Sequence, residues 1–478
     1  MKKLLLSIIT LTVFTLTYGQ KISYQKTYEE ALTEAKNKHK LIFVTIAGPV
    51  PPKNFEIQGR KVNYKSGIDE PEAVDFYNKN FINYTVLITD SASTPFRIRY
   101  QTTTYPAYLF IDDNGNLVYR EKGNTTLASR YITMGNNALA KSASGKTISA
   151  YATRYKLGER SADFLKEYIM LRQDMELFDN AGLADDYVDQ LTIKAFQNYA
   201  DVLFVLKTGP YAYGKAYNLC YTNRKIIDSI YKYEPSSVRS TINNRIITNT
   251  MNEAIKRKSV VMAQQAANFS SSTWSKQNPR QGYTSSQSQM LHYYRGVNDT
   301  ASYFRQAGYY YDTYFMSISA DSAKKLDAKR SENIMKTLTA QHKPDTIRTI
   351  IKGTDSTKRA ISRVTIGRVV TVSNNGATTN SVSSSTANAL NNAAYEFYKM
   401  GTHNPNYLTK ALLWSKRSIE LNPTAAYYDT EAHLLYRLNF FEEAKSAENK
   451  AIDISKNETQ TIINNYKTEL DKIIKRQL

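Results

Sequence analysis

The chain has 478 residues, a formal net charge of +20 and a single cysteine, Cys220. This length predicts two to four domains at roughly 150 residues each, and domains of that size bury enough apolar surface to fold without disulfides. One cysteine excludes an internal disulfide. Cys220 lies in the apolar and aromatic stretch 217–221. We therefore expect a small buried residue there, with a reactive free thiol as the alternative.

The N-terminus predicts export. Lys2 and Lys3 precede an apolar run from Leu4 to Leu16, and Thr17-Tyr18-Gly19 then places small residues at the two positions that a signal peptidase reads. This is the pattern of a secretory signal peptide over residues 1–19, cut after Gly19. No later run approaches the ~18 to 20 apolar residues that span a bilayer. We therefore expect a periplasmic or secreted protein without a transmembrane segment.

The positive charge of +20 falls to +18 when the two signal-peptide lysines are removed. An exported protein rarely meets nucleic acid, so the charge favours contact with an anionic envelope surface or an acidic partner. The basic residues form no dense block and are spread along polar segments, as at 256–258 and 324–325. Solvated helix faces explain the charge most simply.

Residues 20–142 predict one α/β unit. The strand candidates are short, apolar and rich in β-branched residues, which is typical of strands covered on both faces. Asn114-Gly115 is a strong hairpin turn signal. In chain order, the predicted elements are a helix over 28–38, a strand over 41–46, a helix over 70–81, a strand over 83–89, hairpin strands over 108–111 and 117–119, and a helix over 127–139.

This order resembles the thioredoxin-like domains of exported bacterial (Bacteroidetes-type) proteins. The matching landmarks are Ala31 to Val44, the helix over 71–81 with its following strand, and Thr104-Tyr105-Pro106-Ala107 before the strand Leu109-Phe110-Ile111. The resemblance covers residues 20–142. It implies a thioredoxin-like fold in which the peptide bond before Pro106 is cis.

The chain departs from that family at the catalytic turn. Family members carry a Cys-x-x-Cys pair there, whose first thiol attacks disulfides, whereas the positions before Lys53 contain no cysteine. Prolines and the Gly- and Lys-rich tract 58–67 predict that the helix following the turn is shortened or displaced. The resemblance thus implies the fold and a peptide-binding groove without redox activity. The candidate groove residues are Pro49, Val50, Pro51, Pro52, Tyr105 and Pro106.

Residues 149–335 predict helices, because the apolar residues recur at helical spacing and strand signals are absent. Apolar faces over 164–171, 191–204 and 226–231 favour stacked helical hairpins. Residues 269–288 are polar and rich in Ser and Gln, so we expect a long loop there. The dense tyrosines of 290–316 are expected in a helix core, and a surface cluster that binds protein or glycan is the alternative.

Residues 342–386 predict a linker, because they are rich in Thr, Ser, Asn and Lys. Two β-branched runs within it, 347–351 and 364–372, can pair as a small hairpin.

Residues 387–478 resemble tetratricopeptide repeats. The segment 411–423 fits the second helix of one repeat and its closing proline, and 434–452 fits another repeat. Helices over 387–400 and 459–478 are expected to complete and cap the stack.

The sequence indicates no catalytic or metal centre. The five histidines are scattered, with no His-x-x-x-His pair and no cysteine partner. No nucleophile elbow, phosphate loop or dinucleotide fingerprint appears. Asp112-Asp113 and Asp185-Asp186 are explained more simply as turn and loop residues than as catalytic pairs. We therefore predict no enzymatic activity, no metal and no cofactor.

Three functional hypotheses follow. The favoured one is an exported, redox-inactive protein that binds a protein or peptide of the cell envelope through its groove and helical repeats. The second is a protein related to thiol–disulfide oxidoreductases that works through Cys220 or through a cysteine-bearing partner. The third is an envelope-glycan binding protein that uses basic, tyrosine-rich helices.

Overall fold

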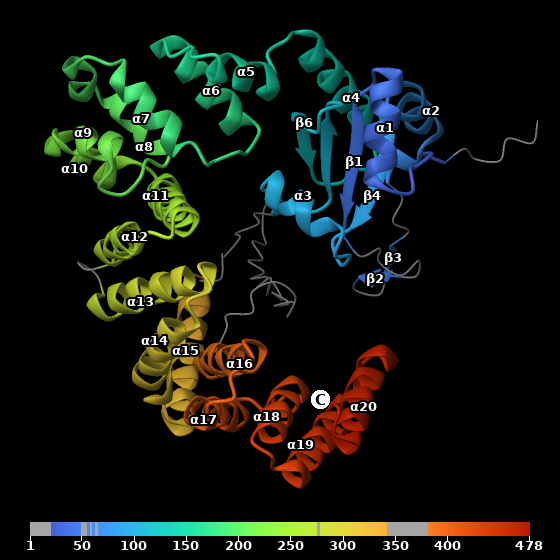
Figure 1. Ribbon diagram of the computed structural model, residues 1–478, viewed down its shortest axis with the longest axis vertical. Helices are drawn as coiled ribbons and strands as arrows, with labels where there is room; N and C mark the ends of the chain where they lie inside the picture. Colours follow the sequence, from blue (N-terminus) through green and yellow to red (C-terminus); the bar gives the residue numbers. More distant parts are fainter. Residues whose placement is uncertain (1–20, 49–54, 58–59, 63–65, 275–277, 342–380) are drawn as a thin grey trace, which may run out of the picture. The chain divides into compact units, whose positions relative to one another are not determined.

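The computed structural model describes residues 21–48, 55–57, 60–62, 66–274, 278–341 and 381–478 (Figure 1). It divides into two compact units, with the division between Glu253 and Ala254. The predicted signal peptide over 1–19, the groove positions Pro49–Pro52 and the possible hairpin within 342–380 lie outside the described residues. Each unit is therefore described by itself.

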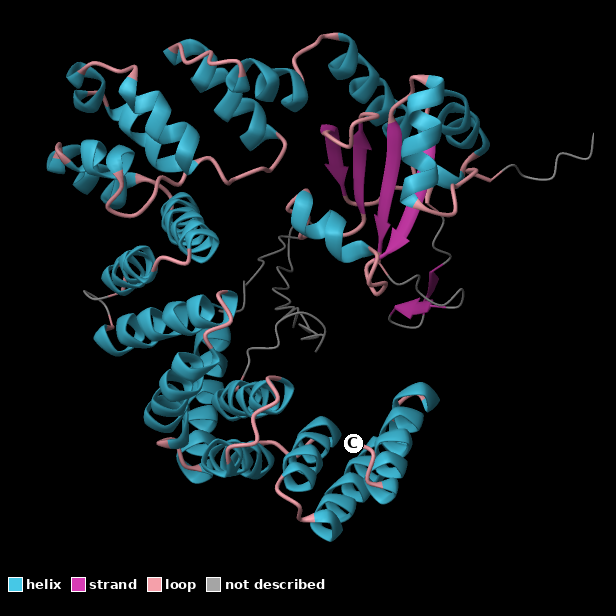
Figure 2. Ribbon diagram, in the orientation of Figure 1, coloured by secondary structure: helices cyan, strands magenta, loops and turns pink. Residues whose placement is uncertain are grey.

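The first unit begins with a mixed sheet, drawn in magenta in Figure 2. Its described strands lie in the order β4 (Ile82–Leu87), β1 (Ile42–Ala47), β5 (Ala107–Ile111), β6 (Leu117–Lys122). β1 runs parallel to β4 and antiparallel to β5, with Val44 opposite both Tyr84 and Leu109. The predicted strands and hairpin are confirmed. In the hairpin turn, Gly115 has a positive φ of 77°, which glycine adopts at little cost.

Helices cover both faces of this sheet. On one face, α2 (Pro71–Asn80) and α4 (Ala128–Ala143) pack on the aromatic side chains of β1 and β5. On the other face, α1 (Tyr28–Lys38) contacts α3 (Ser93–Arg99) through Tyr28 and Phe96, whose ring centroids are 4.7 Å apart. The alternation of side chains along each strand thus supplies two apolar layers. The helices predicted over 28–38, 70–81 and 127–139 are confirmed.

The segment between β1 and α2 contains no helix longer than one turn among its described residues. It has the antiparallel pair β2 (Phe55–Ile57) and β3 (Arg60–Val62), followed by the 3-10 turn η1 (Gly67–Asp69). This agrees with the prediction that the usual helix here is shortened or displaced. The short helix α3 was not predicted, because its sequence STPFRIR places a proline and two arginines around only two apolar residues.

The rest of the first unit is helical, as the apolar spacing predicted. The predicted face over 191–204 is wrong, because Asn198 ends one turn and caps the next helix by accepting hydrogen bonds from the backbone N–H groups of Ala200 and Asp201. The elements are α5 (Ile148–Lys156), α6 (Ala162–Asp174), α7 (Ala181–Asp189), η2 (Ile193–Gln197), α8 (Tyr199–Lys207), α9 (Lys215–Tyr221), α10 (Arg224–Tyr233) and α11 (Ser236–Arg257).

The predicted loop over 269–288 is wrong. Helix α12 (Val260–Ser272) and helix α13 (Pro279–Gly296) occupy most of it. Their small polar residues lie at the contact between the two helices: Ser270 is buried, and a Cβ on Gly282 would be 2.9 Å from the backbone oxygen of Ser271. The Ser- and Gly-rich composition therefore permits close helix packing and does not mark a loop.

The second unit continues as helices in chain order. The predicted linker over 342–386 extends too far, because Ser381 caps a helix that starts at Val382 by accepting a hydrogen bond from the backbone N–H of Ser384. The elements are α14 (Thr300–Tyr311), the π-turn η3 (Asp312–Met316), α15 (Ala320–Gln341), α16 (Val382–Lys399), α17 (Pro405–Leu421), α18 (Ala425–Arg437), α19 (Phe441–Ile454), η4 (Ser455–Asn457) and α20 (Gln460–Lys475).

The core of the second unit surrounds Trp414, which is fully buried and packs against Phe397 and Tyr311. Its indole N–H donates to Asp312 at 2.8 Å. Three of the clustered tyrosines, Tyr293, Tyr303 and Tyr310, are buried, which confirms the prediction that they pack in the helix core. Of the other four, Tyr294, Tyr311 and Tyr314 are half-buried and Tyr309 is exposed. Helices α16 to α20 pack successively against one another, which agrees with the predicted helical hairpins and end helix (Figure 1).

Candidate functional site

The candidate groove of the first unit is described in part. Tyr105 and Pro106 are half-buried, and the peptide bond between them is cis, as the resemblance implied. The hydroxyl of Tyr105 donates to the backbone oxygen of Thr102 at 3.2 Å. Pro49, Val50, Pro51 and Pro52 lie outside the described residues, so their place beside Pro106 stays a prediction.

A cleft of about 440 Å³ lies beside the Tyr105–Pro106 segment. One wall is Thr102, Thr103 and Thr104, of which Thr103 and Thr104 are exposed. The other walls are β6 from Tyr119 to Lys122 and the segment from Asp174, the last residue of α6, to Glu176. The lining carries both signs of charge and several hydroxyls, so it offers donors and acceptors to a polar chain.

Arg120 holds these walls together. Its guanidinium donates to the backbone oxygens of Tyr100 at 2.9 Å and Met175 at 2.8 Å, and to the hydroxyl of Thr102 at 2.9 Å. Its side chain is only 7% exposed, and burial lowers the pKa of the guanidinium, while Glu176 opposes that shift. The threonine wall is thereby fixed to the end of α6. Sequence reasoning missed this role because residue 120 lies far from residue 175 in the chain.

Cys220 is a buried structural residue. It lies on α9 without solvent exposure, and its Sγ is 4.0 Å from the backbone oxygen of Val202. Burial raises the pKa of the thiol to about 12. At neutral pH the sulfur is therefore a thiol and not the nucleophilic thiolate. The prediction of a small buried residue is confirmed, and the structure opposes a thiol reaction at this position.

The two acidic pairs have structural contacts. Asp112 accepts hydrogen bonds from the backbone N–H groups of Asn114 and Asn116 in the hairpin turn, as predicted. Asp185 and Asp186 were predicted in a loop, which is wrong because both lie within α7. Asp185 accepts from the backbone N–H of Ala216 at 2.9 Å, and Asp186 accepts from the Tyr155 hydroxyl at 2.6 Å.

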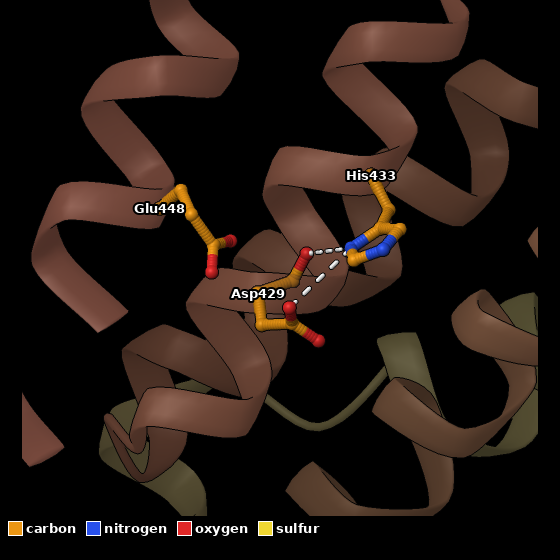
Figure 3. A group of neighbouring side chains, drawn as sticks. All are labelled: Asp429, His433 and Glu448. Atoms are coloured by element: carbon orange, nitrogen blue, oxygen red, sulfur yellow. Dashed lines mark hydrogen bonds and ion pairs between the residues drawn. The ribbon is translucent and has the colours of Figure 1, made fainter. Parts of the chain in front are cut away.

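A second candidate site lies in the second unit, where α18, α19 and α20 meet. Asp429 and His433 are one turn apart on α18, and Glu448 projects toward them from α19 (Figure 3). One potential ligand atom from each of these three residues lies within 4.8 Å of the other two. Glu469 of α20 approaches the other side of the imidazole, with Oε2 3.5 Å from Nε2. We call these four residues the α18–α20 cluster.

The electrostatics of the α18–α20 cluster centre on Glu448. Its side chain is fully buried, and neither carboxylate oxygen has a hydrogen-bond partner among the described residues. Burial raises the pKa of Glu448 to about 8, and the neighbouring Asp429 and Glu469 contribute to this increase. Burial also raises the pKa of Asp429, which Glu469 reinforces and His433 opposes. The arrangement is therefore three carboxyl groups around one imidazole.

The sequence did not predict this cluster. It contains no His-x-x-x-His pair and no histidine–cysteine pattern, and the prediction of no metal rested on their absence. The available signal was Asp429-x-x-x-His433, which places a carboxylate and an imidazole on one helix face. Glu448 and Glu469 join them only through the packing of α19 and α20. A side-chain set of one nitrogen and several oxygens is suited to a divalent metal ion.

Comparison with known proteins adds no assignment: no family model, curated protein or solved structure matches the chain. In the part of the chain that the structure describes, none of the helices combines the length and the apolar character needed to cross a bilayer.

Proposed function

We propose that this protein is an exported, redox-inactive thioredoxin-like protein that binds an extended protein or peptide segment of the cell envelope. The mixed sheet supports this, because its parallel pair is followed by an antiparallel hairpin and a closing helix, which is the arrangement that the resemblance implies. The helices that follow supply the additional surface that such binding proteins use.

The observation that carries the proposal is the contrast between the thiol and the cleft. The single cysteine, Cys220, is buried with its pKa raised to about 12, so no thiol is presented for disulfide exchange. The cleft beside Pro106 nevertheless has exposed threonines and the fixed wall that Arg120 provides. A site that has walls but no thiol suits the binding of a chain better than disulfide exchange.

The burial of three of the seven clustered tyrosines weakens the glycan hypothesis. Tyr293, Tyr303 and Tyr310 pack in the core of the second unit. Their rings therefore cannot provide the exposed stacking surface that a glycan-binding site needs.

Site-specific crosslinking tests the proposal. A photoreactive phenylalanine analogue in place of exposed Thr104 is expected to capture an envelope protein, because this position lines the cleft. The matched control replaces Leu157, which is 83% exposed in the same unit and lies outside the cleft. A captured partner is then purified, and its binding to wild type and to a Thr103→Trp variant, which narrows the cleft, is measured. Equal capture at both positions, or unchanged binding by Thr103→Trp, would contradict the proposal.

A further inference from the structure

The α18–α20 cluster contains a side chain whose environment is incomplete. Glu448 is fully buried, and both of its carboxylate oxygens lack a hydrogen-bond partner within the described residues. A buried carboxyl group without partners is costly, since neither water nor protein compensates for lost hydration. Protonation removes the charge but still leaves the resulting O–H without an acceptor. A cation placed between Glu448 and its neighbours removes both deficits.

The neighbours of Glu448 are arranged to share such a cation. The potential ligand atoms of Asp429, His433 and Glu448 all lie within 4.8 Å of one another. Ligands that bind one ion at 2.0–2.2 Å lie at most about 4.4 Å apart. Small rotations of the side chains therefore suffice to bring all three into one coordination sphere. Figure 3 shows that the Glu448 carboxylate and His433 Nδ1 both face Asp429.

Glu469 completes the arrangement at the second nitrogen of the ring. His433 Nδ1 lies 2.7 Å from the backbone oxygen of Asp429 and 3.5 Å from its Oδ1, while Nε2 lies 3.5 Å from Glu469 Oε2. A carbonyl oxygen only accepts, so in this structure the Nδ1–H group donates to the backbone oxygen of Asp429. A metal bound at Nδ1 displaces this proton and its hydrogen bond, and the Nε2–H group then donates to Glu469. A carboxylate that accepts a hydrogen bond from the other nitrogen of a metal-binding histidine is a frequent arrangement.

We propose that Asp429, His433 and Glu448 bind a divalent transition-metal ion, with Glu469 as the positioning residue that orients the imidazole. Imidazole together with carboxylates favours Zn²⁺ and its first-row neighbours, whereas Ca²⁺ and Mg²⁺ prefer more numerous oxygen ligands. The ion connects α18 to α19 directly and to α20 through Glu469. It therefore holds the last two helices of the chain to the helix before them.

Calorimetric titration of the full chain with ZnCl₂ tests this proposal. The protein carries no polyhistidine tag and is first dialysed against EDTA. Wild type is expected to bind one Zn²⁺ saturably. Glu448→Gln is expected to weaken binding at least about 100-fold, which exceeds the loss usual for a residue outside the coordination sphere. The matched control is Glu431→Gln, which removes a carboxylate outside the cluster from α18, the helix of Asp429 and His433, and is expected to leave the affinity unchanged.

Further measurements separate a loss of metal binding from a loss of folding and test the role of Glu469. Glu448→Gln nearly preserves the shape of the side chain, and an unchanged circular dichroism spectrum establishes that the variant is folded. Glu469→Gln is expected to weaken binding by about 10-fold or more, and nitrogen NMR of bound wild type is expected to show the proton on His433 Nε2. No saturable binding by wild type, equal affinity of Glu448→Gln and wild type, or a bound imidazole protonated on Nδ1 would each overturn the proposal.

Discussion

Cys220 in the first unit and Glu448 in the second are both fully buried ionisable side chains, yet their surroundings differ. Burial alone raises the pKa of Cys220, and the thiol is stable as a neutral, weakly polar group. Glu448 faces two further carboxyl groups and an imidazole without a hydrogen bond from any described residue. The comparison shows that burial of an ionisable group is not enough to indicate a ligand-binding site. Other polar side chains must also lie around the buried group.

Phe43→Ala is expected to have the largest effect on stability, and this effect is expected to be confined to the first unit. Phe43 is fully buried, with its ring centroid 4.3 Å from that of Tyr77 and 5.2 Å from that of Phe110. Loss of the ring leaves a cavity and destabilises the first unit by about 3–5 kcal/mol. Differential scanning calorimetry measures the loss, and Zn²⁺ titration of the same variant is expected to give the wild-type affinity. A reduced Zn²⁺ affinity would show that the two regions are not independent.

A smaller effect is expected from Arg120→Ala. This change leaves the backbone oxygen of Met175 without its donor and leaves that of Tyr100 with only a long hydrogen bond of 3.5 Å from the Thr102 hydroxyl, at a cost of about 1–3 kcal/mol for each unsatisfied group. Urea unfolding measures the loss, and the crosslinking yield at Thr104 is expected to fall because the threonine wall is no longer fixed.

Lys122→Ala is the matched control for Arg120. Lys122 also pairs with Glu176 from β6, but its side chain is 52% exposed. An exposed pair of this kind contributes about 0–1 kcal/mol. Equal losses of stability in the two variants would contradict this account. They would show that Arg120 stabilises the unit through its ion pair with Glu176 and not through its hydrogen bonds to the backbone.

The sequence predicted the first region better than the second. The elements of residues 20–142 follow from local patterns, such as the apolar strand over 41–46 and the Asn114-Gly115 turn, and the structure has them within a few residues. The small-residue stretch over 269–288 was misassigned because Ser and Gly favour both loops and close helix packing. Whether such a stretch forms a loop or closely packed helices depends on contacts with segments that are distant in the chain. A pattern in a single sequence does not contain this information.

The same distinction applies to the sites. Tyr105 and Pro106 were found because they belong to one short motif, and the burial of Cys220 follows from its aromatic neighbours in the chain. Glu448 and Glu469 lie 15 or more residues from His433 on separate helices, within sequences that are otherwise typical of solvated helix faces. Their burial depends on how α19 and α20 pack on α18. The metal-binding set was therefore not accessible to a search for fixed spacings.

At neutral pH the smallest expected effect on stability concerns the thiol. At pH 7, Cys220 is expected to react with a chromogenic disulfide reagent only after unfolding, because its thiolate is scarce in the folded chain. Stability is expected to fall between pH 9.0 and pH 12, since the unfolded thiol ionises from its ordinary pKa of 9.0 while the folded thiol stays protonated up to about 12. The difference between wild type and Cys220→Ala isolates this contribution from other groups. Rapid reaction of the folded protein at pH 7 would revive the thiol hypothesis.

Hydrogen exchange with and without Zn²⁺ tests the central contrast between the two buried groups most directly. We expect slower amide exchange over α19 and α20, where Glu448 and Glu469 would hold the helices to α18, and unchanged exchange over α9, which carries Cys220. Unchanged exchange over α19 and α20, or an equal change over α9, would contradict the account.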